Sequence, residues 1–207
     1  MGHQETEFLN GGEGNRWFQR NRMKWYSRIK DDPVLNATKF FKPASVLEIG
    51  CSNGWRLEQY RIVNTANCVG IDVSDDAIAD GRNKFPGITL IKGTASYQSF
   101  LRDIDMVIYG FCLYVCDRDN LSSIVSVGDF ALKDGGHLIV HDFDPEHPHK
   151  VPYHHKDGIF SYKMDYSKLW LANPAYTLVS KTTIPDGTAV WVLKKDISSG
   201  WPEETLT

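Results

Sequence analysis

A short glycine-rich segment carries the clearest chemical signal in this sequence. Gly50, Ser52 and Gly54 alternate with other residues at the end of an apolar run that contains Glu48. Small residues let a ligand approach the backbone closely, and a helix beginning at Trp55 would offer free N–H groups to a polar ligand. A dinucleotide fingerprint would read Gly-x-Gly-x-x-Gly without the acid. The pattern predicts a ligand-binding loop of a different kind.

A second acid follows where a ribose-binding group would be needed. Asp72 ends the apolar run 69–72, eighteen residues after Gly54. A carboxylate at a strand end suits two ribose hydroxyls and repels a 2′-phosphate, and ligands of open α/β sheets bind at the carboxyl ends of strands. The two segments together predict a nucleoside pocket at one edge of a sheet.

Six of the seven histidines gather in the second half of the chain, and three interpretations remain open. One histidine could be a general base for a hydroxyl acceptor, with His141 at a strand end best placed and His154 and His155 next. Histidine together with Asp142 and Asp144 could hold a divalent metal. The histidines could also form a polar lid or plain surface. Their spacing is not typical of metal sites, so we expect no metal.

The elements that must position these residues follow from the apolar runs. Five short runs alternate with stretches long enough for crossover helices, as expected of buried parallel strands. The runs are 45–49, 68–72, 88–92, 106–109 and 138–141. Two more strands, 176–182 and 189–194, flank a Pro-Asp-Gly turn and predict an antiparallel hairpin. We therefore expect an α/β, Rossmann-like, seven-stranded, mostly parallel sheet that ends in this hairpin.

The domain organisation follows from a change in sequence pattern near residue 44, where short apolar runs begin to alternate with helical stretches. Residues 1–43 are expected to form an N-terminal helical cap, helical over 13–42 with a break at Asp31-Asp32-Pro33. Residues 44–207 are expected to form the main domain, with an aromatic and histidine-rich insertion at about 142–172. The whole chain is expected to be one structural domain.

Composition narrows the class of partner. Among 207 residues, 23 are Lys or Arg and 26 are Asp or Glu, so the net charge of −3 gives no basic excess for nucleic acid. The longest strongly apolar run, 106–116, is too short to span a bilayer. Four cysteines without Cys-x-x-Cys spacing, and the lack of a signal-like N-terminus, favour a cytoplasmic protein with free thiols. The oligomeric state stays open.

Five segments, in this order and spacing, resemble the motifs of class I S-adenosylmethionine-dependent methyltransferases. They are residues 47–54, 70–74, 93–95, 105–111 and 132–137. The resemblance implies S-adenosylmethionine as cofactor, S-adenosylhomocysteine as product, and a set of binding residues. In chain order these are Trp17, Arg20, Glu48, Gly50, Ser52, Gly54, Asp72, Val73, Thr94, Ala95, Tyr109 and Phe111.

The roles within this set are also implied by the resemblance. Asp72 would take the ribose, and Thr94 with Ala95 would flank the adenine. Thr94 stands where many relatives carry an acid toward the adenine amino group, so mainly backbone contacts to adenine are expected. Tyr109 and Phe111 would lie beside the transferring methyl group.

The function expected from this resemblance is methyl transfer to a small polar acceptor, such as a sugar or nucleotide-sugar. Residues 10–21 and 110–121 are faintly similar to small methylases encoded with pseudaminic acid biosynthesis. The alternative is a non-catalytic cofactor-binding or regulatory protein with the same fold. A nicotinamide oxidoreductase is disfavoured by Glu48 and by the terminal hairpin.

Overall fold

The computed structural model describes residues 2–26, 29–96 and 101–201. The helices are α1 (His3–Leu9), α2 (Glu13–Tyr26), α3 (Pro33–Thr38), α4 (Trp55–Asn64), α5 (Asp75–Lys84), α6 (Leu121–Ala131), α7 (Lys168–Leu171) and α8 (Ile197–Gly200). The strands are β1 (Ser45–Ile49), β2 (Asn67–Asp72), β3 (Thr89–Lys92), β4 (Ile104–Gly110), β5 (Leu132–Phe143), β6 (His149–Pro152), β7 (Phe160–Lys163), β8 (Tyr176–Ile184) and β9 (Thr188–Lys195).

The main sheet has seven strands in the order β3-β2-β1-β4-β5-β9-β8. Strands β1 to β5 pair in parallel, whereas β9 is antiparallel to both β5 and β8. The predicted Rossmann-like sheet with a C-terminal hairpin is therefore confirmed. Between β3 and β4 the described residues, 93–96 and 101–103, are not helical. The rest of that expected crossover, 97–100, lies outside the described residues.

Helix starts coincide with side chains that satisfy free backbone N–H groups. The Ser74 side chain accepts a hydrogen bond from Ala77 N at 3.1 Å, so α5 begins directly after β2. Asp32 accepts from Leu35 N at 2.8 Å and begins α3, with Pro33 in its first turn. The predicted break between the cap helices therefore lies where Asp32 and Pro33 stand.

The sheet is covered on both faces. One apolar cluster joins the sheet to α6 and α7, and the other joins it to α3, α4 and α5. Because successive strand residues point to opposite faces, Tyr109 faces the α6 side of β4 and Ile108 faces the α4 side. This alternation decides which of the predicted site residues can reach a common cavity.

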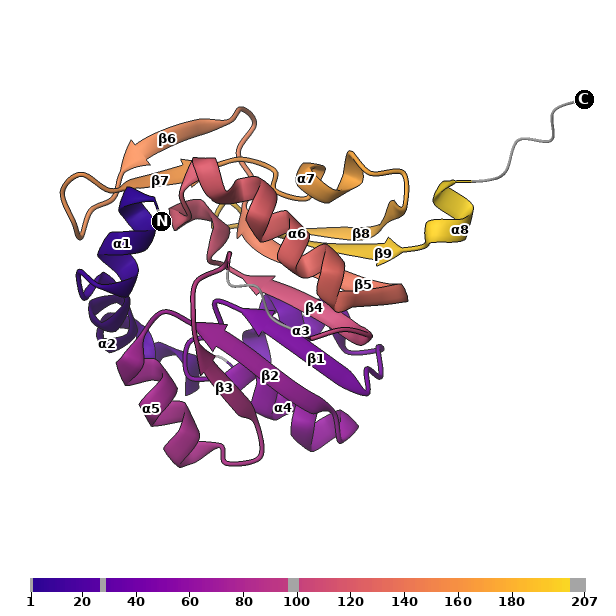
Figure 1. Ribbon diagram of the computed structural model, residues 1–207, viewed down its shortest axis with the longest axis horizontal. Helices are drawn as coiled ribbons and strands as arrows, with labels where there is room; N and C mark the ends of the chain where they lie inside the picture. The colour runs from indigo at the N-terminus through magenta and orange to yellow at the C-terminus, as the bar shows by residue number, and fades with distance from the viewer. Residues whose placement is uncertain (1, 27–28, 97–100, 202–207) are drawn as a thin grey trace, which may run out of the picture.

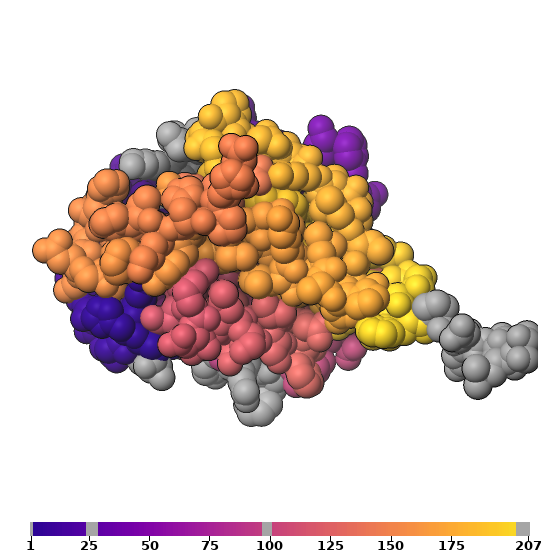
Figure 2. Space-filling model, turned by 90° about the horizontal axis from the view of Figure 1, so that it is seen from above, coloured from indigo at the N-terminus to yellow at the C-terminus, as the bar shows by residue number. Residues whose placement is uncertain are grey.

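The N-terminal helices and the two-stranded sheet of β6 and β7 meet at one end of the molecule (Figure 1). The Gln4 side chain is buried; it donates to Val115 O at 2.8 Å and Phe160 O at 3.2 Å, and it accepts from Phe160 N at 2.8 Å. Seen from above, the orange β6–β7 segment lies beside the indigo N-terminal segment (Figure 2). Helix α1 lies outside the helical range expected from the sequence.

Two further observations concern membrane-spanning helices and the cysteines. In the part of the chain that the structure describes, no helix is long and apolar enough to cross a bilayer. All four cysteines are free thiols, and two of them, Cys51 and Cys68, are buried.

Candidate active site

A cavity of about 780 Å³, measured out to its open mouth, lies at the carboxyl ends of the parallel strands. Its lining comes from the cap, from the ends of β1, β2 and β3, and from the chain after β4. The residues are Glu5, Phe8, Gly14, Trp17, Gly50, Ile71, Asp72, Val73, Gly93, Thr94, Ala95, Phe111, Cys112, Tyr114, Val115, Cys116, Asp117, Asn120 and Ile124.

Asp72 is held by the loops on either side of it. Its Oδ2 accepts from Ser52 N at 2.7 Å and its Oδ1 accepts from Ser74 N at 2.9 Å. Burial raises the pKa of Asp72, although these backbone N–H groups act in the opposite direction. Each carboxylate oxygen keeps a second lone pair, so Asp72 can still accept from hydroxyl groups of a ligand.

The glycine loop needs its glycines. Gly50 has φ +74° and Gly54 has φ +76°, a region that favours glycine. A Cβ at Gly50 would lie 2.5 Å from Cys112 Cβ, and one at Gly54 would lie 2.4 Å from Ile88 Cδ1. Larger residues at either position would therefore displace the loop that lines the cavity.

Phe111 holds a strained backbone at the end of β4. Its φ is +66°, which is unusual for a bulky residue, and such strain tends to occur at functional sites. Phe111 N donates to His141 O at 2.8 Å, and the ring contacts Tyr114 and Phe143. The strain directs an aromatic ring into the cavity wall.

The structure brings seven of the twelve predicted cofactor residues to this cavity. They are Trp17, Gly50, Asp72, Val73, Thr94, Ala95 and Phe111. Two more, Ser52 and Gly54, support it without lining it, through the Ser52 N–H and the turn into α4. The remaining three, Arg20, Glu48 and Tyr109, lie elsewhere.

Tyr109 is buried and Arg20 is partly exposed, and both are bonded to other residues of the chain. Tyr109 OH donates to Ile124 O at 2.6 Å on the α6 face, and its ring packs on Trp170. Arg20 donates to Glu13 Oε1 at 2.5 Å and to Tyr153 OH at 3.1 Å. Neither side chain lines the cavity, so a direct contact with cofactor would require both to move.

Glu48 belongs to a buried ion network on the α4 face. Its Oε1 accepts from Arg56 Nη1, and Arg56 also pairs with Asp32 through Nη2 at 3.0 Å and Nε at 3.1 Å. Burial raises the pKa of Glu48 to about 7, although the Arg56 charge acts against this. Burial would also raise the pKa of Asp32, but Arg56 holds it below its ordinary value. The network joins the cap to β1.

The three candidate catalytic histidines do not come together. His141 lies at the end of β5, with Nε2 3.4 Å from Thr188 Oγ1 and with Nδ1 buried and unbonded among the described residues. His154 and His155 are exposed in the turn between β6 and β7. None of the three lines the cavity. A role as general base therefore stays a prediction.

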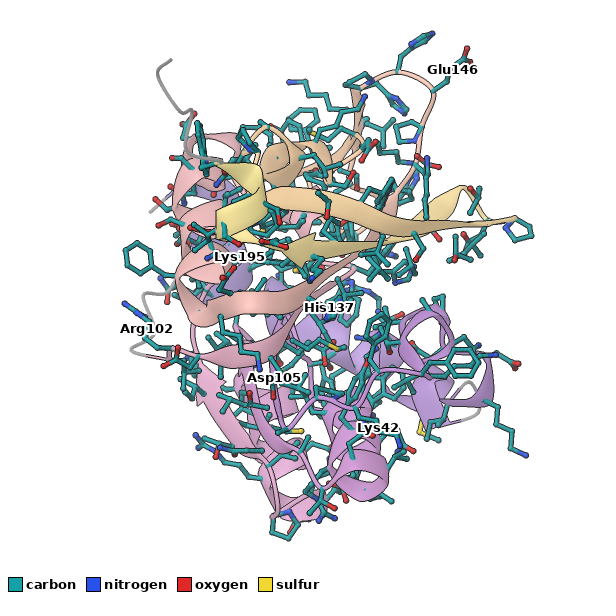
Figure 3. All side chains as sticks on the ribbon, turned by 90° about the vertical axis from the view of Figure 1, so that its right-hand side faces the viewer. Lys42, Arg102, Asp105, His137, Glu146 and Lys195 are labelled. Carbon is teal, nitrogen blue, oxygen red and sulfur yellow. The ribbon has the colours of Figure 1, made fainter. Side chains whose placement is uncertain are left out.

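The other histidines do not line the cavity either. His147 follows Glu146 on an exposed loop that projects from the sheet (Figure 3). His137 lies at the amino-terminal side of the sheet, where its ring packs against Phe41 at a tilt of 60°. Within the described ranges, no group of three or more His, Cys, Asp or Glu side chains is arranged to hold a metal ion.

His141 gives the first testable prediction. Burial, with a smaller contribution from the Arg56 charge, lowers the pKa of His141 to about 4. The unfolded chain takes up this proton near pH 6.5, so wild type loses stability as the pH falls from there toward 4, by about 1.4 kcal/mol per pH unit. We expect His141→Gln to abolish the part of the pH dependence of stability that comes from His141. Urea unfolding at pH 7.5 and pH 5, with the exposed His155→Gln as control, measures it. The prediction would be wrong if the difference in unfolding free energy between wild type and His141→Gln were the same at both pH values.

Several lining residues were not expected from the sequence. Glu5 and Phe8 come from α1, and Asp117 and Asn120 come from the loop after β4. Asp117 accepts from Gln4 N at 3.1 Å and Glu5 N at 2.7 Å and so fixes the start of α1. The polar loop 117–121 following an apolar strand was the available sequence signal. The seven residues of α1 have no periodic apolar pattern.

Comparison with known proteins agrees with this architecture. Residues 46–136 match the family described as a methyltransferase domain. A search of curated proteins finds no significant match. Among solved structures, the chain is similar to the 1,6-didemethyltoxoflavin-N1-methyltransferase of Burkholderia thailandensis bound to 1,6-didemethyltoxoflavin and S-adenosylhomocysteine. The identity is 12%, with 95% of this chain and 91% of that chain covered and a TM-score of 0.74.

Two further structures show the same fold. The DhpI–S-adenosylhomocysteine complex is 15% identical, with 95% of this chain and 100% of that chain covered and a TM-score of 0.70. DesVI of Streptomyces venezuelae is 17% identical, with 91% and 99% covered and a TM-score of 0.62. Residues 46–136 are thus similar to a methyltransferase domain, and the chain as a whole shares the fold of these structures. The expected fold is confirmed, and these findings agree with the expected enzyme class and with S-adenosylmethionine as its cofactor.

Proposed function

We propose that this protein transfers a methyl group from S-adenosylmethionine to a small polar acceptor held in the same cavity. The observation that carries the proposal is the convergence of the glycine loop, Asp72 and the Thr94–Ala95 segment on one space beneath the cap. The resemblance alone predicted these segments in order along the chain. Their meeting in one cavity is what a nucleoside cofactor requires.

The residues present fit this cofactor. Asp72 has lone pairs for two ribose hydroxyls, and Gly50 lets the backbone approach because a Cβ there would collide with Cys112. A Cβ at Gly14 would come within 2.9 Å of Val73 Cγ2, so the cap also comes close to the binding loop only because it carries glycine. When bound, S-adenosylmethionine supplies a methyl group on a positively charged sulfonium.

The side chains of the cavity would act mainly by positioning. Methyl transfer is an in-line displacement, for which proximity and orientation supply most of the acceleration. Phe8, Trp17, Phe111 and Tyr114 give rigid walls that exclude water. Three acids, Glu5, Asp72 and Asp117, line the cavity, and no Lys or Arg appears among its described lining residues. This charge balance favours a cationic cofactor.

The same charge balance bears on the acceptor. A sugar or another neutral or cationic molecule suits a cavity lined by acids and aromatic rings. A nucleotide-sugar fits less well, because its diphosphate would meet carboxylates without a cationic partner. Tyr114 lines the cavity, but it stands where the methylases of pseudaminic acid biosynthesis tend to carry histidine, so this position gives no support to an acceptor shared with them. A general base from His141, His154 or His155 would require the acceptor to extend beyond the cavity.

An acceptor screen tests the proposal. The protein is incubated with S-adenosylmethionine and pools of small neutral, cationic and phosphorylated compounds, and S-adenosylhomocysteine formation is followed together with product mass. We expect turnover with a neutral or cationic acceptor and a product heavier by one methylene group. Tight cofactor binding with no turnover in any pool would instead favour the non-catalytic alternative. The triple change of His141, His154 and His155 to Gln then tests the base: full retained turnover would withdraw that role.

A further inference from the structure

The far end of the cavity, beyond β3, contains a connected set of polar side chains. Glu5 Oε1 accepts from Ser96 Oγ at 2.8 Å, and Glu5 Oε2 accepts from Asn120 Nδ2 at 2.8 Å. Thr94 Oγ1 lies 3.0 Å from Ser96 Oγ. Glu5, Thr94 and Asn120 all line the cavity, although they are far apart in the sequence.

The hydrogen bonds fix which groups are left for a ligand. A carboxylate only accepts, so Ser96 gives its single hydroxyl proton to Glu5, and Thr94 must then donate to Ser96. Thr94 Oγ1, Glu5 and Asn120 Oδ1 consequently keep lone pairs available at this end of the cavity. Such a set accepts hydrogen bonds from an amino group and repels a carbonyl oxygen.

Glu5 is held firmly in this position. The backbone N–H groups of Gln4 and Glu5 donate to Asp117, and the buried Gln4 side chain ties α1 to the loop after β4 and to β7. Both oxygens of Asp117 accept from these backbone N–H groups, and both oxygens of Glu5 accept from side chains at the polar end of the cavity. Of the two acids, Glu5 is therefore the one joined to the Thr94–Ser96 segment that follows β3.

The position of Asp72 fixes the direction of a bound nucleoside. Strand β3 lies beside β2, and Gly93 N donates to Asp72 O at 2.9 Å, so Thr94 and Ala95 come next to the ribose-binding acid. Val73, Ala95 and Ile124 give this part of the lining apolar surface suited to a flat heteroaromatic ring. A base attached to a ribose at Asp72 extends along this surface toward the polar end.

We propose that Glu5, delivered by α1, recognises the 6-amino group of the cofactor's adenine. This inference rests on the proposed function, since it assumes that S-adenosylmethionine binds in the cavity. This proposal replaces the expectation of mainly backbone contacts to adenine. Thr94 occupies the position where many relatives carry an acid, and here the acid is supplied by the N-terminal helix instead. The cap then determines which nucleoside the cavity accepts, as well as covering it.

The test compares two ligands that differ at this edge of the base, where the 6-amino group and bare N1 of adenine are replaced by the 6-carbonyl and N1–H of hypoxanthine. S-adenosylhomocysteine and S-inosylhomocysteine, which carries a carbonyl in place of the amino group, are titrated calorimetrically into wild type, Glu5→Gln and Glu7→Gln. Glu7 is on the same helix but pairs with Lys156 at 3.1 Å and does not line the cavity. Melting curves establish that each variant folds.

We expect wild type to prefer S-adenosylhomocysteine by tenfold or more. Glu5→Gln should weaken S-adenosylhomocysteine binding about tenfold, or about 1.4 kcal/mol, and narrow the preference, because glutamine can also donate to a carbonyl. Glu7→Gln should change neither. Equal binding of both ligands by wild type, or an unchanged preference in a folded Glu5→Gln, would overturn the role of Glu5 while leaving the proposed function standing. No binding of either ligand to wild type would overturn both.

Discussion

Replacing Arg56 by methionine is expected to destabilise the protein by about 3–5 kcal/mol, because the change leaves two buried carboxylates without their partner. Arg56 is almost fully buried and bridges Asp32 at the start of α3 to Glu48 in β1. Methionine replaces the length of the side chain but supplies no charge. Urea unfolding at pH 8 measures the loss.

Two comparisons separate this effect from ordinary packing loss. Arg61→Met removes a solvent-exposed ion pair with Glu58 on the same helix and should cost far less stability than Arg56→Met. Adding Glu48→Gln to Arg56→Met should recover part of the stability. The deficit of Arg56→Met should also shrink as the pH falls, because unpaired Glu48 and Asp32 then become protonated. A deficit of the same size at pH 8 and pH 5 would contradict the charge argument.

Asp72→Asn is expected to weaken S-adenosylhomocysteine binding by tenfold or more, which is at least about 1.4 kcal/mol. The amide retains one acceptor oxygen but turns a donor toward Ser52 N or Ser74 N, both of which need an acceptor. The change therefore disturbs the glycine loop as well as the ribose contact. Calorimetric titration at constant temperature gives the ratio of dissociation constants.

Asp75→Asn is the matched control for this variant. Asp75 lies three residues further on, is mainly exposed, and pairs with Lys92 at 2.6 Å outside the cavity. Its replacement should leave cofactor affinity unchanged within about twofold, a difference of about 0.4 kcal/mol. If Asp72→Asn bound the ligand as tightly as Asp75→Asn, the nucleoside site would have to lie elsewhere.

Much of the fold was predictable because its signals are local. The apolar runs that became β1 to β5 are continuous, as expected of strands covered on both faces, and the Pro-Asp-Gly turn of residues 185–187 joins β8 to β9. Ser74 and Asp32 mark helix starts through contacts only three residues long. Each of these features is determined by neighbours in the sequence, so the local sequence was sufficient to predict it.

The face of the sheet from which the Tyr109 side chain projects was not predictable in the same way. In a strand covered on one face, alternation of polar and apolar residues reveals which side chains point inward. Every residue from Met106 to Tyr109 is buried, so the sequence shows no alternation in β4. Only the packing of Tyr109 on Trp170, with its hydroxyl bonded to Ile124 O, shows that it faces α6.

The polar end of the cavity depends on long-range contacts. Glu5 meets Ser96 and Asn120 across 91 and 115 positions of sequence, and Gln4 meets Phe160 across 156. No local pattern connects these residues, and α1 itself is only seven residues long. Its position is set by its tertiary contacts, since an isolated helix of this length is not stable in water.

The measurement that tests the central claim most directly is a calorimetric titration of S-adenosylhomocysteine into wild-type protein, with NAD titrated in parallel. We predict saturable binding of one S-adenosylhomocysteine per chain with a micromolar dissociation constant, and no binding of NAD. The cavity at Gly50, Asp72 and Thr94 would then be the cofactor site that the methyltransferase domain requires. No binding of S-adenosylhomocysteine, or preferential binding of NAD, would contradict the proposed function.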